Sequence, residues 1–389
     1  MRTQRTQIVG AREAQFTAPR SGFTLVELLV VITIISILAA LITGAAIAAL
    51  RTARQAAIKT DVTEISGAFE KYKDKAGSYP PNAVTDDTSF ASPEPTGTTT
   101  PLDEVQVLAD MRAHFSKAFQ RSKESDNLAR VLVGSPAADT TNYPKVLDGG
   151  MTAGEATVFW LSGFSDDVSY PFSGQGGPSY EIPEFGISNN RKADPITSRS
   201  WMHQFNLDRL GPRADDGYFD ETNGRFIEYR VTINGVQKYR RINFWQYTPS
   251  RSTQPVLYFD VSRNPAAVLS GSNVIGSFDP PAASERAGNP PGSMQLHVHA
   301  LKMRSQSAAA NVPIQFANQG KFQVLHCGID DAWGAEILEL TSAHGVEEAG
   351  GNPADPAAYL LFPTGPFTGD AADTVVNFIV PSRLEDAQQ

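Results

Sequence analysis

The sequence predicts an α+β fold in which a long N-terminal helix packs on an antiparallel β-sheet head that carries large loop insertions. Three observations support this prediction. Residues 28–50 form a run of 23 uncharged residues, and apolar residues then recur at helical spacing as far as Tyr72. Residues 225–245 hold an Asn-Gly pair between two strand-forming stretches, which is typical of a β-hairpin.

The composition indicates a folded chain that is rich in loops, with 41% hydrophobic residues, 31 glycines and 26 prolines in 389 residues. Its net charge of −9 is unevenly distributed, because residues 1–22 carry +3, residues 23–76 carry +1 and the remainder carries −13. Such an acidic body has no basic footprint for nucleic acid, so we expect no nucleic-acid partner. Cys327 is the only cysteine, which excludes an intrachain disulfide.

The uncharged run is long enough to cross a membrane. As a helix, residues 28–50 would extend over about 35 Å, and the hydrocarbon core of a bilayer is about 30 Å thick. A cleaved secretory signal has a shorter apolar region and a small-residue cleavage site, and neither is present. Because the arginines of residues 1–22 precede the run, we expect a cytoplasmic N-terminus, although Arg51, Arg54 and Lys59 on the far side weaken this signal.

A single carboxylate, Glu27, stands at the start of the apolar run. A plain signal anchor would explain the hydropathy alone, but submerging a carboxylate costs a few kcal/mol and calls for a partner that an anchor lacks. The stretch Gly22-Phe23-Thr24-Leu25-Val26-Glu27, followed directly by the apolar run, closely resembles the prepilin cleavage and methylation signature of type IV pilins and type II secretion pseudopilins.

In that family a prepilin peptidase cuts after the glycine and methylates the new N-terminal residue. The resemblance therefore implies cleavage after Gly22, methylation of Phe23, and pairing of Glu27 with the N-terminal amine of a neighbouring subunit. It divides the chain into four parts. Residues 1–22 are a cytoplasmic leader, and residues 23–50 are the membrane-spanning half of the helix. Residues 51–76 are its amphipathic half, and residues 77–389 are an exported β-rich head.

The function implied by the resemblance is that of a non-enzymatic structural subunit of a type IV pilus or a type II secretion pseudopilus. We expect a single-pass protein of the bacterial inner membrane, with a periplasmic or extracellular head, that assembles with other pilin or pseudopilin subunits into a filament. Removing 22 of the 389 residues leaves 367, which is large for a major subunit and favours a minor or specialised one. Two alternatives stay open: an exported enzyme or metal-binding protein on a pilin-type anchor, and an adhesin displayed on a filament.

Beyond residue 50 the helix is expected to continue as an amphipathic element as far as Ala76, where Gly77 and Pro80-Pro81 supply a stop signal. Its apolar residues recur at spacings of 4, 3, 4 and 3, at Ile58, Val62, Ile65, Phe69 and Tyr72. A second helix is predicted from the similarly spaced residues Val105, Leu108, Met111, Phe115 and Phe119.

Strands should dominate the rest of the head. A two-residue turn at Asn234-Gly235 would place Ile233 opposite Val236, Glu228 opposite Arg241 and Arg230 opposite Tyr239. Further strands are predicted at residues 255–261, 294–303, 321–326, 335–340 and 373–380. The four tryptophans are spread over most of the head, which favours core positions over an adhesive surface.

Two sets of residues suggest metal sites. The stretch 321–335 resembles the end of pilin-like heads, where a loop binds calcium in major pseudopilins, so Asp330 and Asp331 are the ligands that the resemblance suggests. The loop lacks most of the six to eight oxygens that calcium requires, and an Asx turn is the competing interpretation. His297 and His299 would share one face of a strand and could bind a metal, but no third ligand follows from the spacing.

Overall fold

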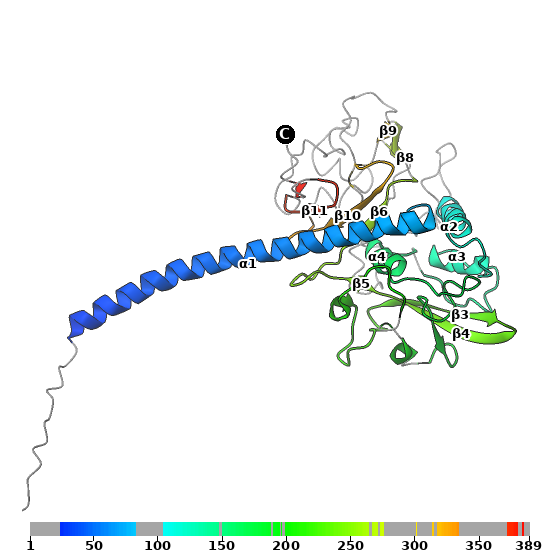
Figure 1. The fold of residues 1–389 in the computed structure, drawn as a ribbon, viewed down its shortest axis with the longest axis horizontal. Helices are drawn as coiled ribbons and strands as arrows, with labels where there is room; N and C mark the ends of the chain where they lie inside the picture. The colour runs from blue at the N-terminus through cyan, green and yellow to red at the C-terminus, as the bar shows by residue number, and fades with distance from the viewer. Residues whose placement is uncertain are drawn as a thin grey trace, which may run out of the picture. The chain divides into compact units, whose positions relative to one another are not determined.

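The computed structural model describes residues 24–82, 104–147, 150–187, 190–194, 196, 199–263, 267–270, 273–275, 301, 313–314, 317–333, 372–379 and 383–384. The chain divides into two compact units, Met1–Thr52 and Ala53–Gln389. Helix α1, Leu25–Ala76, contributes its first half to one unit and its second half to the other (Figure 1).

The first unit contains the apolar half of α1. From Leu25 to Leu50 its large apolar side chains are 42–79% exposed, so no protein core covers them. Of the helices that the structure describes, α1 alone is long and apolar enough to cross a membrane, by length and composition. The predicted long N-terminal helix is confirmed, and it ends at the expected glycine. Gly77 has a φ of +80° and donates its N–H to the carbonyl of Lys73 at 2.7 Å, which is a left-handed cap.

In the second unit the amphipathic half of α1 packs on an antiparallel three-stranded sheet of order β11-β10-β6 (Figure 1). These strands are β6 at Leu257–Asp260, β10 at Phe322–His326 and β11 at Val375–Val376. The ring of Phe69 stacks on Tyr258 with centroids 3.8 Å apart, and Phe322 lies beside both. All five residues of the predicted apolar face of α1 are at most 1% exposed.

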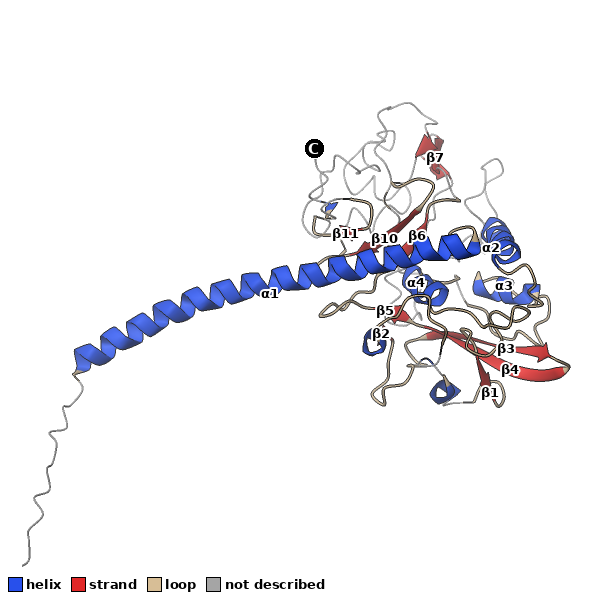
Figure 2. Cartoon of the chain, viewed as in Figure 1, coloured by secondary structure: helices blue, strands red, loops and turns tan. Residues whose placement is uncertain are grey.

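The Asn-Gly hairpin forms a second sheet, of order β1-β4-β3, from β1 at Tyr180–Ile182, β3 at Arg225–Ile233 and β4 at Val236–Phe244 (Figure 2). The register is the predicted one, with Ile233 opposite Val236, Glu228 opposite Arg241 and Arg230 opposite Tyr239. Asn234 and Gly235 have φ values of 51° and 79°, as a type I′ turn requires. The guanidinium of Arg230 lies 4.7 Å from the ring centroid of Tyr239.

Three further helices lie in this unit, α2 at Glu104–Ala118, α3 at Asp126–Leu132 and α4 at Ala153–Leu161. The sequence predicted α2 but neither α3 nor α4. Every residue of α4 is buried, so α4 has no polar face and no amphipathic spacing. A capping box between Thr152 and Glu155 begins this helix, and Arg225 pairs with the buried Glu155 carboxylate at 3.0 Å.

Short elements complete the described fold. Strands β2 at Leu210–Gly211 and β5 at Gln246–Tyr247 pair with each other, and β7 at Ala267–Ser270 lies between β8 at Asn273–Ile275 and β9 at Pro313–Ile314. Single turns of 3₁₀ helix occur at Asn190–Ala193 and Leu207–Arg209. The strands predicted at 255–261 and 321–326 are confirmed, and the one predicted at 373–380 is observed over two residues only. Residues 335–340 and most of 294–303 lie outside the described residues, so the strands predicted there stay predictions.

The tryptophans are core residues, as predicted. Trp160, Trp245 and Trp333 are 0–5% exposed, and Trp201 packs partly buried against the core. Trp160 stands at the centre of an aromatic cluster that joins α1, α2 and α4 through rings such as Tyr72 and Phe115. Three of the four rings are therefore buried too deeply to stack on a sugar.

Candidate functional site

The N-terminal end of α1 carries a reciprocal capping arrangement between Thr24 and Glu27. The Thr24 N–H and hydroxyl both donate to Oε2 of Glu27, at 2.9 and 2.8 Å, and the Glu27 N–H donates back to the Thr24 hydroxyl at 3.2 Å. This is a capping box, which satisfies backbone donors that the first turn of a helix leaves unpaired. The Thr-x-x-Glu spacing could have predicted it from sequence, and our sequence analysis missed it.

The capping box uses only one of the two carboxylate oxygens. Among the residues that the structure describes, none donates a hydrogen bond to Oε1 of Glu27. The predicted processing residues Gly22 and Phe23 lie outside the described residues. Glu27 is thus held in place by its own helix and keeps one oxygen for another partner.

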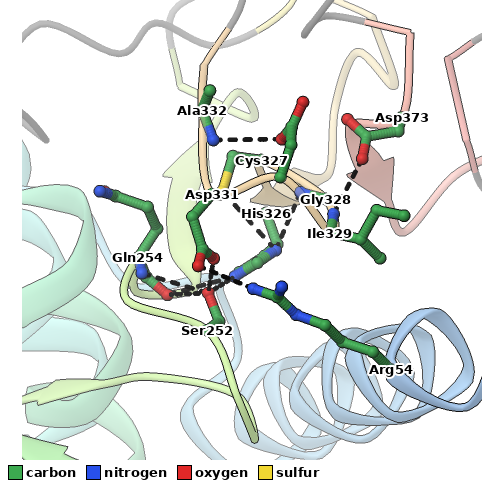
Figure 3. A network of polar contacts seen from close by, with 11 residues as sticks. Arg54, Ser252, Gln254, His326, Cys327, Gly328, Ile329, Asp331, Ala332 and Asp373 are labelled. Carbon is green, nitrogen blue, oxygen red and sulfur yellow. Dashed lines mark hydrogen bonds and ion pairs between the residues drawn. The ribbon is translucent and has the colours of Figure 1, made fainter. Parts of the chain in front are cut away.

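A second group of polar residues lies in the head, where β10 ends. Ser252, His326 and Asp331 meet here with Arg54 of α1, although these residues are far apart in the sequence (Figure 3). Arg54 donates to Asp331 Oδ2 at 2.7 Å, and the Ser252 hydroxyl donates to the other carboxylate oxygen. Burial opposes ionisation of Asp331, but the hydrogen bonds from Ser252 and Arg54 prevail and hold its pKa below the ordinary value.

The hydrogen bonds also fix the tautomer of His326. The Gly328 N–H donates to Nδ1 at 3.0 Å, so Nδ1 carries no proton in the neutral ring. Nε2 is then protonated and donates to the Gln254 carbonyl at 3.1 Å. Because the ring is fully buried, the pKa of His326 falls to about 4.

This order of hydrogen bonds is not that of a catalytic triad. In a Ser-His-Asp triad the carboxylate accepts from Nδ1 of the histidine, and the serine donates to Nε2. Here the Asp331 carboxylate accepts from Ser252, while His326 Nδ1 accepts from a backbone amide. With its Nε2 protonated, His326 cannot take the proton of Ser252, although the two groups lie 3.0 Å apart.

Two residues of this network, His326 and Asp331, form a group of possible metal ligands with Cys327, since their ligand atoms lie within 4.8 Å of one another. A bound metal needs deprotonated ligands with free lone pairs. Burial raises the pKa of the Cys327 thiol well above its ordinary value, and both oxygens of Asp331 already accept hydrogen bonds. A cation would also have to displace the Arg54 guanidinium, so the group fits a structural network better than a metal centre.

The residues singled out as calcium ligands have different surroundings. Asp330 Oδ1 accepts from the Ala332 N–H at 3.1 Å, which is the Asx-turn geometry, and Asp331 belongs to the network with Arg54. Calcium binding by Asp330 and Asp331 stays a prediction. His297 and His299 lie outside the described residues, so their shared metal site stays a prediction as well.

Further polar contacts fasten α1 to the head beyond the Arg54 pair. Asn377, which follows β11, accepts the Val324 N–H of β10 at 2.9 Å and donates to the Ser66 hydroxyl of α1 at 3.2 Å. Arg209 lies 3.4 Å from the Asp61 carboxylate. One face of α1 is therefore joined to the sheet by side-chain hydrogen bonds as well as by apolar packing.

Comparison with known proteins gives one finding, at the N-terminal end of the chain. Residues 18–43 match the family described as the prokaryotic N-terminal methylation motif, the signature of type IV pilins and pseudopilins. A search of the curated proteins and a search of the solved structures returned no match. The match covers the motif and the first part of α1, and the head lies outside it.

Proposed function

We propose that the chain is the precursor of a pilin-like filament subunit, which is cleaved by a prepilin peptidase after Gly22 and methylated at Phe23. The observation that carries this proposal is the methylation motif at residues 18–43, which extends into the first part of α1, where the large apolar side chains are exposed. The role is structural rather than catalytic. The hydrogen-bond order around Ser252 and His326 is consistent with that role.

Assembly would use the free oxygen of Glu27. Cleavage after Gly22 creates an ammonium group at Phe23, and the apolar half of α1 leaves no route to solvent once helices pack together in the membrane. An unpaired carboxylate or ammonium costs several kcal/mol in such surroundings, and pairing offsets a large part of both costs. Glu27 of one subunit would therefore bind the Phe23 amine of a neighbour and set the register between them.

The proposed location is the bacterial inner membrane, with the N-terminus in the cytoplasm and the head on the far side. The positive charge of residues 1–22 supports this orientation. The partners would be the prepilin peptidase and other pilin or pseudopilin subunits. The size of the mature chain supports a minor or specialised subunit of a type IV pilus or a type II secretion pseudopilus.

Intact mass and N-terminal sequence test the proposal directly. The protein recovered from membranes should begin at methylated Phe23 when an active prepilin peptidase is present, and at Met1 when the peptidase is inactive. A Gly22→Leu variant, which blocks the cleavage position and leaves Glu27 intact, is the matched control and should stay full-length. A chain that still begins at Met1 beside an active peptidase would contradict the proposal.

A further inference from the structure

A cavity of about 550 Å³ lies in the head, where the C-terminal ends of α1 and α2 meet the loop that follows α4. Figure 1 shows these two helix ends close together. Sites for small molecules in proteins usually enclose roughly 300–1,000 Å³, so this cavity is large enough for one. Neither the methylation motif nor the network around His326 shares a residue with it.

One part of the cavity wall is apolar and is supported by the core. Phe119 and Phe164 meet edge to face with ring centroids 4.8 Å apart, and Met202 lies beside them in the lining. Phe164 also contacts Trp160 of the buried aromatic cluster, at 6.2 Å between centroids. Val168, which is 58% exposed, extends this apolar surface to the rim. Rings held by a core offer a preformed surface to an apolar ligand.

The charges in the lining are mainly positive. Lys75, Lys117 and Arg121 line the cavity together with one carboxylate, Asp166. Within the part of the chain that the structure describes, none of the three cations forms an ion pair. A net charge of +2 in one cavity stands out on a chain whose residues beyond 76 carry −13.

The stem of one of these cations, Lys117, lies against the end of α1. The Cε of Lys117 lies 3.0 Å from the position that a Cβ on Gly77 would occupy, so the lysine stem rests against this glycine. Gly77 already needs its positive φ to end α1, and its missing side chain also makes room for Lys117. The partial negative charge at the ends of α1 and α2 favours cations here, but it does not require an apolar hollow between them.

We propose that this cavity binds an organic anion whose carboxylate is joined to an aromatic or branched apolar body. The apolar body would pack on Phe119, Phe164 and Met202, and the carboxylate would lie among Lys75, Lys117 and Arg121. The carboxylate could belong to a free organic acid or to an acidic residue beside an aromatic one in a peptide. This proposal does not depend on filament assembly.

The test uses the full chain purified in detergent micelles, with empty micelles as the blank. Ligand-observed NMR would compare N-acetylphenylalanine with N-acetylphenylalanine amide, which has the same body without the charge. We expect the acid to bind about fivefold more tightly than the amide, because two or three exposed ion pairs contribute a fraction of 1 kcal/mol each. N-acetyl-aspartyl-phenylalanine amide, which places the carboxylate on a peptide side chain, tells the two sources apart.

Variants locate the binding. Lys117→Gln combined with Arg121→Gln should weaken binding of the acid by up to about fivefold and leave the amide unaffected. Lys321→Gln removes an equally exposed charge outside the cavity and should change nothing. Both lining residues are exposed, so an unchanged urea unfolding midpoint would show that the variant folds. Equal binding of acid and amide, failure of both acids to bind, or wild-type affinity in the double variant would overturn the proposal.

Discussion

At the scale of single residues, Glu27 has an observed capping role and a proposed pairing role, which substitution can separate. Its Oε2 belongs to the capping box with Thr24, and its Oε1 has no partner among the described residues. The capping role needs only a hydrogen-bond acceptor, whereas pairing with an ammonium group needs a negative charge. Glutamine at this position keeps the acceptor and removes the charge.

We therefore expect Glu27→Gln to be processed at Phe23 like the wild type but to lose at least about tenfold in filament incorporation, because an unpaired buried ammonium costs more than 1.4 kcal/mol. Incorporation would be measured by shearing filaments from cells and quantifying the subunit. Glu64→Gln, which removes an exposed carboxylate from the same helix, is the control and should assemble normally. If Glu27→Gln assembled normally, the proposed pairing with the Phe23 amine would be wrong, and Glu27 would serve only to cap the helix.

At the scale of elements, the predictions from sequence succeeded where the signal is local. The β3–β4 hairpin has an Asn-Gly turn and strand-forming residues on both sides, so its register followed from the turn length. Helix α4 was missed because it is buried on all sides, which removes the periodicity that identifies a helix. The network of Arg54, Ser252 and His326 was missed for another reason. It joins residues that only the tertiary fold brings together.

The hydrogen bonds that Asn377 forms with β10 and with α1 give a prediction at this scale. Asn377→Ala should lower the free energy of unfolding by about 1–3 kcal/mol, because the buried Val324 N–H of β10 loses its acceptor. Ser66→Ala removes only the second hydrogen bond of Asn377 and should cost about 1 kcal/mol or less. Urea unfolding of the full chain in detergent would measure both. An equal cost for the two variants would mean that the amide oxygen of Asn377 contributes little.

At the scale of the whole molecule, buried titratable groups make stability depend on pH. Burial lowers the pKa of His114 to about 3 and that of His326 to about 4, so both rings are neutral in the fold at pH values where they are protonated in the unfolded chain. Burial raises the pKa of Asp260 to about 6, which acts in the opposite direction. Burial also lowers the pKa of His203, which acts with the two histidines, and raises the pKa of Asp61, Glu124 and Glu155, which act with Asp260.

The two buried histidines should therefore make stability fall as the pH is lowered from about 6.5 towards 4. The contribution of the two neutral histidines to folding stability is fully present above the unfolded-state pKa near 6.5. It is lost as the pH falls from there towards the lowered pKa values of the folded state. Urea midpoints at pH 7.5, 6 and 5 would measure the slope. His326→Gln should make the curve flatter in this range, and an unchanged slope would show that His326 is not neutral in the fold.

The burial of the second half of α1 determines where a water-soluble version of this protein can begin. Ile58, Val62, Ile65, Phe69 and Tyr72 are at most 1% exposed, and they cover the face of the β6–β10 sheet. Expression from Gly77 onwards would strip that cover and leave a large apolar surface open to aggregation. Expression from Ala53 keeps the cover together with Arg54, and discards the apolar half of α1, which needs detergent. Crystallisation and binding assays in plain buffer should start from Ala53.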